Sequence, residues 1–152
     1  MKLAPEAPST QPAVTSLMIE LPFGLIGLPH LKHFELTPVQ GVFPLMRLAS
    51  IGQEQIQFLV LEPHEALKNY EIELRDEDTE SLGISQPEDC LVINIVTIHS
   101  ESPQYVTLNL IGPIVINRHT LVGKQVILEN SERYSTAHAL VDERPNSSAR
   151  SS

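Results

Sequence analysis

The chain has 152 residues, a formal net charge of −9 and 41% hydrophobic residues, which is enough for one globular domain that buries about two-thirds of its unfolded surface. The acidic balance argues against direct binding to nucleic acid or to an anionic membrane surface, because both need clustered Lys and Arg. Aromatic residues make up 5% and Trp is absent, so the composition excludes a platform that stacks single-stranded bases.

Targeting and redox signals in the sequence favour a cytoplasmic protein. Cys90 is the single cysteine, which excludes an internal disulfide and is typical of a reducing compartment. Its position at the start of an apolar run favours a buried, unreactive thiol over a nucleophile. The amino end has no apolar core of signal-peptide length, and no segment reaches the roughly 20 apolar residues of a membrane span.

The two ends of the chain differ in composition from its middle. Residues 1–16 are rich in Pro, Ala, Ser and Thr without periodicity, which predicts a disordered extension. The same argument predicts a disordered tail over residues 142–152. We therefore expect an ordered domain that spans residues 17–141.

Most of this ordered part reads as short strands, because Val and Ile dominate its apolar runs and turn residues separate them. The expected strands span residues 17–21, 31–36, 44–50, 56–61, 70–74, 90–98, 105–110, 114–117 and 122–128, with a closing segment at 136–141. Residues 22–31, PFGLIGLPHL, are dense in Pro and Gly and predict an irregular turn. The predicted fold class is a small, mostly β, antiparallel and barrel-like domain with two or three short helices.

Helical signals concentrate in the acidic segment 62–89. It carries ten acids against two bases, a sum of −8 that is nearly the whole net charge. Within it, acids crowd the first turn of residues 76–82 and Gly83 supplies a left-handed stop, which predicts a short helix. Residues 63–68 predict a second short helix, and residues 85–89 a turn or a single helical turn.

The run CLVINIVTI at residues 90–98 is apolar on both parities, which predicts a strand covered on both faces. Asn94 and Thr97 interrupt it, and each is either a core hydrogen-bonder or a floor residue of a groove. The next strand alternates better, and its Tyr105, Thr107 and Asn109 are expected to form a wet face.

The sequence contains few candidate metal-ligating or catalytic residues. His30 and His33 have a spacing compatible with metal ligation, but zinc sites need three or four ligands, and surface histidines are the alternative. His99 and His119 each follow a strand and offer a start for a hydrolase site, although a nucleophile–base pair is defined in space. We expect no metal and no cofactor. P-loop, dinucleotide-binding and nucleophile-elbow motifs do not occur in the sequence.

The acidic segment has two interpretations. One is a solvated, solubilising helix face. The other is a negative patch around Glu77, Asp78 and Glu80 that steers a basic protein partner, since complementary charge raises association rates.

Several separated motifs resemble the flagellar assembly factor family FliW. They are PED at residues 87–89, NIVT at 94–97, NL at 109–110, PIVIN at 113–117 and GKQVIL at 123–128. Upstream, GLIG at 24–27 is similar to the family's G-L-P-G with Ile in place of Pro. The resemblance covers roughly residues 17–141 and the motifs occur in the family's order.

The resemblance implies a non-enzymatic, barrel-like protein that binds cytosolic flagellin and, alternatively, the RNA-binding translational regulator CsrA. In such a partner switch, flagellin occupies the factor until export frees it to antagonise CsrA. We expect a monomer. The residues predicted to contact partners are Asn94, Thr97, Asn109 and Asn117, polar groups on apolar strands, together with the acidic Glu77, Asp78 and Glu80. A barrel that binds a small ligand, and a hydrolase that uses His99 and His119, are the alternatives.

The sequence also departs from the family pattern. The family usually opens with an additional strand and hairpin before the G-L-P-G region, and here that place holds the Pro-rich segment. Arg118 stands where a Pro commonly follows the Asn. The first departure predicts an altered amino edge of the barrel.

Overall fold

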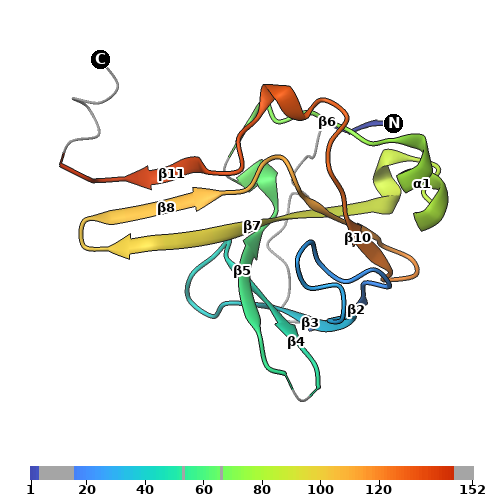
Figure 1. Ribbon diagram of the computed structural model, residues 1–152, viewed down its shortest axis with the longest axis horizontal. Coiled ribbons are helices and arrows are strands. Elements are labelled where there is room, and N and C mark those ends of the chain that lie inside the picture. Colours follow the sequence, from blue (N-terminus) through green and yellow to red (C-terminus); the bar gives the residue numbers. More distant parts are fainter. Residues whose placement is uncertain (4–15, 53, 66, 146–152) are drawn as a thin grey trace.

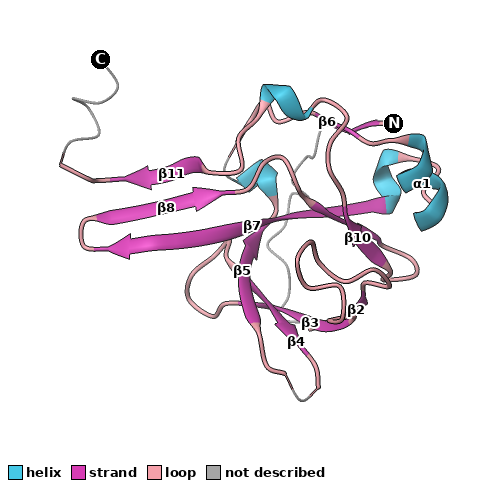
Figure 2. Cartoon of the chain, viewed as in Figure 1, coloured by secondary structure: helices cyan, strands magenta, loops and turns pink. Residues whose placement is uncertain are grey.

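The computed structural model describes residues 1–3, 16–52, 54–65 and 67–145, and it confirms a mostly β fold (Figure 1 and Figure 2). The strands are β1 (Lys2–Leu3), β2 (Leu17–Glu20), β3 (His33–Pro38), β4 (Met46–Ser50), β5 (Gln57–Leu61), β6 (Ile72–Glu73), β7 (Cys90–Glu101), β8 (Gln104–Leu108), β9 (Ile114–Asn117), β10 (Gly123–Gln125) and β11 (His138–Asp142). The helical segments are α1 (Asp76–Leu82) and the 3-10 turns η1 (Pro63–Glu65), η2 (Pro87–Asp89) and η3 (Ser131–Arg133).

The main sheet curls back on itself. Its path runs β10-β9-β7-β5-β4-β3-β2, with antiparallel pairing throughout. The two ends of this path meet where Glu20 of β2 forms a parallel bridge with Val122, just before β10, and donates its N–H to the carbonyl of Leu121 at 3.0 Å. One bridge is not a continuous hydrogen-bonded seam, so the domain is barrel-like, as predicted, without being a closed barrel.

Strand β7 crosses the whole molecule and organises it (Figure 1). It pairs with β9 over residues 90–93, with β5 over residues 94–96, and with β8 over residues 96–101. Leu91 and Ile93 belong to one hydrophobic core, whereas Val92 and Val96 belong to a second one. Both faces of the strand are therefore covered, which confirms the prediction made from its apolar residues on both parities.

The two cores lie on opposite faces of β7. The inner core fills the curled sheet with side chains such as Phe34, Leu48, Val60, Ile114 and Ile116, as is usual for small barrels. The outer core joins β7, β8 and β9 to β1, β6 and the α1 region through side chains such as Leu3, Ile72, Leu82, Leu108 and Val115. Burial of each such side chain contributes about 1.5–3 kcal/mol to folding.

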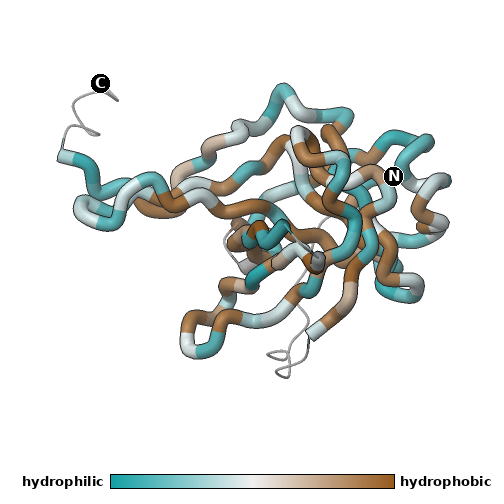
Figure 3. The backbone as a smooth tube through the Cα atoms, turned by 60° about the horizontal axis from the view of Figure 1, so that its bottom comes forward, coloured by the Kyte–Doolittle hydropathy of each residue, from teal (hydrophilic) through white to brown (hydrophobic). Residues whose placement is uncertain are grey.

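A three-stranded ribbon projects from this body (Figure 1). It consists of the far half of β7 with β8 and β11, and register shifts interrupt both of its ladders. Figure 3 shows hydrophobic segments gathered in the body, while the hairpin tip of the ribbon is more hydrophilic. The ribbon reaches beyond the main core, so its outer part is more exposed than the half of β7 inside the body.

The structure corrects the prediction for the amino end. Lys2 and Leu3 form β1, pair with Glu73 and Ile72 of β6, and bury Leu3 in the outer core at 4% exposure. The expected disordered extension is therefore wrong for its first three residues, and residues 4–15 lie outside the described part. Pairing with the distant β6 thus orders residues whose Pro-rich surroundings predict disorder.

The predicted carboxyl-terminal tail also begins too early. Strand β11 runs to Asp142, and the next residue, Glu143, donates its N–H to the carbonyl of Gln104 at 2.8 Å. Residues 146–152 lie outside the described part. Long-range pairing with β8 therefore extends order beyond the point where composition changes.

Strand lengths differ from the sequence predictions where pairing stops. Strand β10 ends at Gln125, while Val126 and Leu128 continue with separate backbone bonds to the carbonyls of Pro113 and Ile111. Helix α1 ends as predicted, with Gly83 left-handed at φ 68°. In the segment expected to be helical over 63–68, the described residues contain the 3-10 turn η1 and no α-helix, and η2 is the predicted single turn. Among the described residues, none of the helices has the length and apolar character needed to cross a membrane.

Candidate functional site

Asn94 lies entirely inside the protein. Its side-chain N–H groups donate to the backbone carbonyl of Asn109 at 2.7 Å and to the hydroxyl of Tyr70 at 3.2 Å, and its exposed fraction is 0%. The Tyr70 hydroxyl in turn donates to the carbonyl of Leu110, and burial raises the pKa of Tyr70. Of its two predicted roles, Asn94 has the core one, because no partner reaches a side chain without exposed surface.

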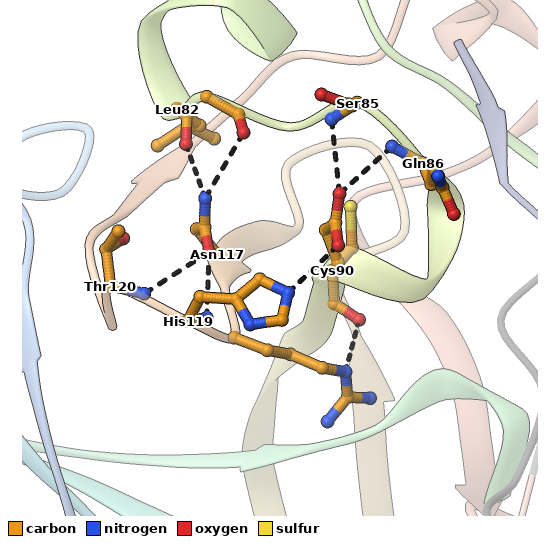
Figure 4. A network of polar contacts seen from close by, with 10 residues as sticks. Leu82, Ser85, Gln86, Cys90, Asn117, His119 and Thr120 are labelled. Atoms are coloured by element: carbon orange, nitrogen blue, oxygen red, sulfur yellow. Dashed lines mark hydrogen bonds and ion pairs between the residues drawn. The ribbon is translucent and has the colours of Figure 1, made fainter.

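Asn117 fastens the end of α1 to the turn after β9 (Figure 4). Its side-chain N–H donates to the carbonyl of Leu82 at 2.8 Å, and its carbonyl oxygen accepts from the backbone N–H groups of His119 at 2.8 Å and Thr120 at 3.3 Å. The side chain is 4% exposed. A buried amide that bonds three backbone groups is a structural connector rather than a contact surface.

Asp89 organises the adjacent turn, where Figure 4 labels Ser85 and Gln86. One carboxylate oxygen accepts from the N–H groups of Ser85 and Gln86, and the other lies 2.9 Å from Nε2 of His119. The bond from His119 and the two backbone bonds hold the pKa of Asp89 below its ordinary value. Beside it, burial raises the pKa of the Cys90 thiol to about 11, so the thiol is protonated and unreactive near neutral pH.

The two histidines of the hydrolase alternative do not converge. His119 bonds Asp89 at the start of β7, whereas His99 lies near the end of that strand, about 30 Å away at 3.3 Å per residue. His99 stacks on Tyr105 with ring centroids 4.5 Å apart and bonds the hydroxyl of Thr107 at 2.8 Å. A triad needs its members within hydrogen-bond reach, so this pair forms no catalytic site.

The predicted wet face of β8 is wrong at Thr107, which is 2% exposed. The stack of His99 on Tyr105 and the guanidinium of Arg144, 3.6 Å from the Tyr105 ring centroid, lie along this strand. Along β8, Thr107 is therefore covered, while Tyr105 stays half-buried between Arg144 and the exposed His99.

Metal ligation is not supported by the geometry. His30 pairs with Glu54 at 2.9 Å on the surface. In the described ranges, the structure contains no group of three or more His, Cys, Asp or Glu side chains placed to hold an ion.

Asp78 does not belong to the exposed acidic surface that the sequence predicts. Asp78 is 4% exposed, and its carboxylate lies 2.6 Å from Nζ of Lys124, so it fastens α1 to β10. Glu77 and Glu80 are exposed, and so is Asp76 at the first position of the helix. Arg75 lies 3.9 Å from Glu77 and offsets part of the charge. The exposed acids of α1 that could attract a basic partner are therefore Asp76, Glu77 and Glu80.

Of the four uncharged residues predicted to contact partners, Thr97 and Asn109 reach the surface. Thr97 is exposed on β7. Asn109 is half-buried, and its side-chain oxygen accepts from the N–H groups of Ile111 and Gly112 at 3.0 Å each. Asn109 also lines a groove.

That groove is the apolar feature that the sequence reasoning missed. We call it the Ile26 groove; its volume is about 340 Å³, and it is lined by Leu25, Ile26, Leu28, Phe58, Ile95, Asn109, Ile111, Gly112, Gln125, Ile127 and Thr136. Ile26 is 62% exposed and Ile127 is 42% exposed, and Phe23 in the same loop as Ile26 is 66% exposed. The sequence signal for this groove lies in PFGLIGLPHL, where large apolar residues stand among the Gly and Pro that predict an irregular turn.

Comparisons with known proteins agree on one family. A family model described as FliW protein matches residues 6–140. The flagellar assembly factor FliW of Clostridium novyi is 40% identical over 126 residues, 83% of this chain and 87% of that protein. The flagellar assembly factor FliW of Thermosipho africanus is 38% identical over 117 residues, 77% and 80% of the two chains. A crystal structure of the flagellar assembly factor FliW superposes with a TM-score of 0.72 at 34% identity and covers 84% of this chain and 87% of that one.

Proposed function

The chain belongs to the FliW family of flagellar assembly factors, and we propose that it binds flagellin and, in alternation, the translational regulator CsrA. Family membership is the observation that carries this proposal. The matched relatives share most of their length with this chain, so the proposal concerns the whole domain. In this role the protein is cytoplasmic and monomeric, and it acts through contacts rather than by catalysis.

A partner switch of this kind depends on competition for a limiting binder. The fraction of the protein bound to each partner follows from the two dissociation constants and the two free concentrations. When flagellin accumulates it occupies the protein, and when flagellin is exported the freed protein binds CsrA. Exposed acids support the second interaction, because a negative surface attracts a basic RNA-binding protein and repels RNA.

Two features of the structure favour a binding protein over the alternatives. The interior of the curled sheet is filled by the inner core, which leaves the binding surfaces on the outside. The one pair of histidines considered for hydrolysis lies at opposite ends of β7. The surfaces available to partners include the Ile26 groove and the exposed acids of α1.

The test is a direct binding assay with purified components. Flagellin and CsrA are titrated separately into the labelled protein, and each is then used to displace the other. We expect both to bind and excess flagellin to release CsrA. Failure of both to bind would contradict the proposal, and simultaneous binding without displacement would remove the switch.

The acidic patch has its own test. Charge reversal at Glu77 and Glu80 removes exposed charge without touching the buried pair of Asp78 and Lys124. We expect weaker CsrA binding with a shallower salt dependence, and unchanged flagellin binding. An unchanged CsrA affinity at low salt would assign these acids to solubility alone.

A further inference from the structure

The two ends of the curled sheet meet along a narrow contact, which we call the seam. In the part of the chain that the structure describes, its backbone contacts are the parallel bridge of Glu20 with Val122 and the 3.0 Å bond from the Glu20 N–H to the Leu121 carbonyl. By contrast, β2 pairs with β3 along four residues, and β3 pairs with β4 along five. Few hydrogen bonds therefore need to break for the sheet to open at the seam.

Leu121 has a strained backbone conformation at this seam. Its φ is 59°, and among the described residues it is the only one besides glycine with a positive φ. In the left-handed region the Cβ of an L-residue comes too close to the backbone, which costs free energy for a residue as bulky as leucine. Loss of the bond to Glu20 allows Leu121 to return to a negative φ, so the strain favours an open seam.

Asn117 opposes this strain because it fixes the turn that carries Leu121. Its side-chain oxygen accepts from the N–H groups of His119 and Thr120 (Figure 4). Its backbone carbonyl accepts from the N–H of Leu121 at 2.8 Å, and its own N–H donates to the carbonyl of Val122 at 2.9 Å. Four hydrogen bonds to one residue thus hold the turn in the closed conformation.

Asn117 also connects this turn to the rest of the fold. It pairs with Cys90 in the ladder between β9 and β7, and its side-chain N–H donates to the carbonyl of Leu82 at the end of α1. The side chain of Leu121 packs against the inner core. Backbone strain persists in a folded protein where the surrounding contacts over-determine the conformation, and these contacts do so for Leu121.

The Ile26 groove lies across the seam. Leu25, Ile26 and Leu28 of its lining follow β2 in the chain, whereas Gln125 and Ile127 belong to β10 and to the residues after it. One further bond crosses here, from the N–H of Ile26 to the side-chain oxygen of Gln125 at 2.8 Å. Separation of β2 from the 118–122 turn would therefore move one wall of the groove relative to the other.

We propose that the seam is a latch, which opens locally in a minor state of the folded protein and which Asn117 keeps closed by holding Leu121 left-handed. Opening exposes the N–H of Glu20 and loosens the wall of the groove that follows β2. The latch goes beyond the proposed function, and its test needs no partner, so the outcome of one does not decide the other.

Hydrogen exchange at two neighbouring amides tests whether the seam opens on its own. The Glu20 N–H bonds across the seam, while the Leu21 N–H bonds the carbonyl of Lys32, just before β3, at 2.7 Å. In the unmodified full chain, followed by NMR, we expect the protection factor of Glu20 to be about tenfold or more below that of Leu21. Equal protection of the two amides would show that the seam does not open separately, and would overturn the proposal.

Two substitutions at position 121 separate the strain from the loss of the side chain. Leu121→Gly and Leu121→Ala both remove the apolar side chain, but glycine alone adopts a positive φ without strain. We expect the Glu20 amide to be about fivefold better protected in Leu121→Gly than in Leu121→Ala. Equal protection, or better protection in Leu121→Ala, would mean that backbone strain does not act on the seam.

Asn117→Ala tests the group that keeps the latch closed. We expect it to lower the protection of Glu20 by about fivefold more than that of Leu21, and to have a smaller effect in the Leu121→Gly background, where no strain needs to be opposed. Asn69→Ala, at an exposed asparagine, should change neither amide. An equal loss at Glu20 and Leu21, or the same effect in both backgrounds, would reduce Asn117 to a general contributor to stability and overturn its role in the latch.

Discussion

Two regions of the molecule use their side chains in opposite ways. One is the turn network, formed by Asp89, Asn117 and His119, and the other is the Ile26 groove. In the turn network, polar side chains satisfy backbone groups of α1 and of neighbouring turns. In the groove, backbone and amide bonds hold large apolar side chains toward solvent. The comparison teaches that polar residues on apolar strands stabilise this fold, while exposed apolar residues in a fixed loop are the better candidates for partner contact.

The largest loss of stability is expected for Gly24→Ala, a change in the loop that carries Ile26. Gly24 has φ 67°, and an added Cβ would lie 2.4 Å from the carbonyl oxygen of Leu28. We expect a loss of about 3 kcal/mol or more of unfolding free energy, measured by urea denaturation. Gly27→Ala is the matched control, because Gly27 has φ 86° with nothing near its Cβ position; equal losses would show that strain alone, and no close approach, requires Gly24.

Asn117→Ala removes hydrogen bonds from the turn network. The change removes a donor to Leu82 and an acceptor for two backbone N–H groups in a buried place, so we expect a loss of roughly 2–3 kcal/mol in unfolding free energy. Partner affinity of the folded protein should stay the same. Asn69→Ala, at an exposed asparagine, should change stability by less than about 0.5 kcal/mol. A selective loss of binding by Asn117→Ala would return Asn117 to the contact surface.

The pair of Asp78 and Lys124 connects the two regions, since it fastens α1 beside the rim of the groove. A double-mutant cycle with Asp78→Asn and Lys124→Met should give a coupling of about 1–2 kcal/mol in unfolding free energy. The coupling should persist at high salt because Asp78 is buried. Additive effects of the two changes would mean that the 2.6 Å contact contributes no net stability.

The smallest effect concerns pH. Because the pKa of Asp89 is lowered in the folded protein, its stabilising contribution is complete above the carboxyl pKa of the unfolded chain, about 4, and is lost as pH falls through the folded value. The stability difference between wild type and Asp89→Asn should therefore shrink on acidification below about pH 4. Glu88→Gln changes the same charge on an exposed neighbour and should show a flatter difference; identical profiles would contradict the role given to His119.

Local sequence patterns predicted the parts of the site that depend on neighbouring residues. The stop of α1 at Gly83 and the turn within residues 85–89 were predicted because each depends on the chemistry of consecutive residues. The two-sided burial of β7 was predicted from its residues on both parities. The family was indicated by separated motifs, since their order along the chain is visible in a single sequence.

Other features depend on residues far apart. The sequence predicts Asp78 as a surface acid, whereas in the structure it pairs with Lys124, 46 positions later in the chain. The sequence places Ile26 in a turn. The structure shows that its N–H bonds the side chain of Gln125 and that Ile127 lines the same groove. Neither partner is marked in the sequence, because pairing between distant strands decides which side chains meet.

The sequence by itself determined a mostly β domain, its central strand and its family, because apolar periodicity, turn chemistry and motif order are local properties of the chain. The tertiary structure alone decided which polar groups are connectors and which apolar groups remain in contact with water. The physical reason is that burial and hydrogen bonding are properties of the packed chain. In the sequence, an asparagine on β7 or β9 looks the same whether it bonds a backbone carbonyl inside the protein or contacts a partner.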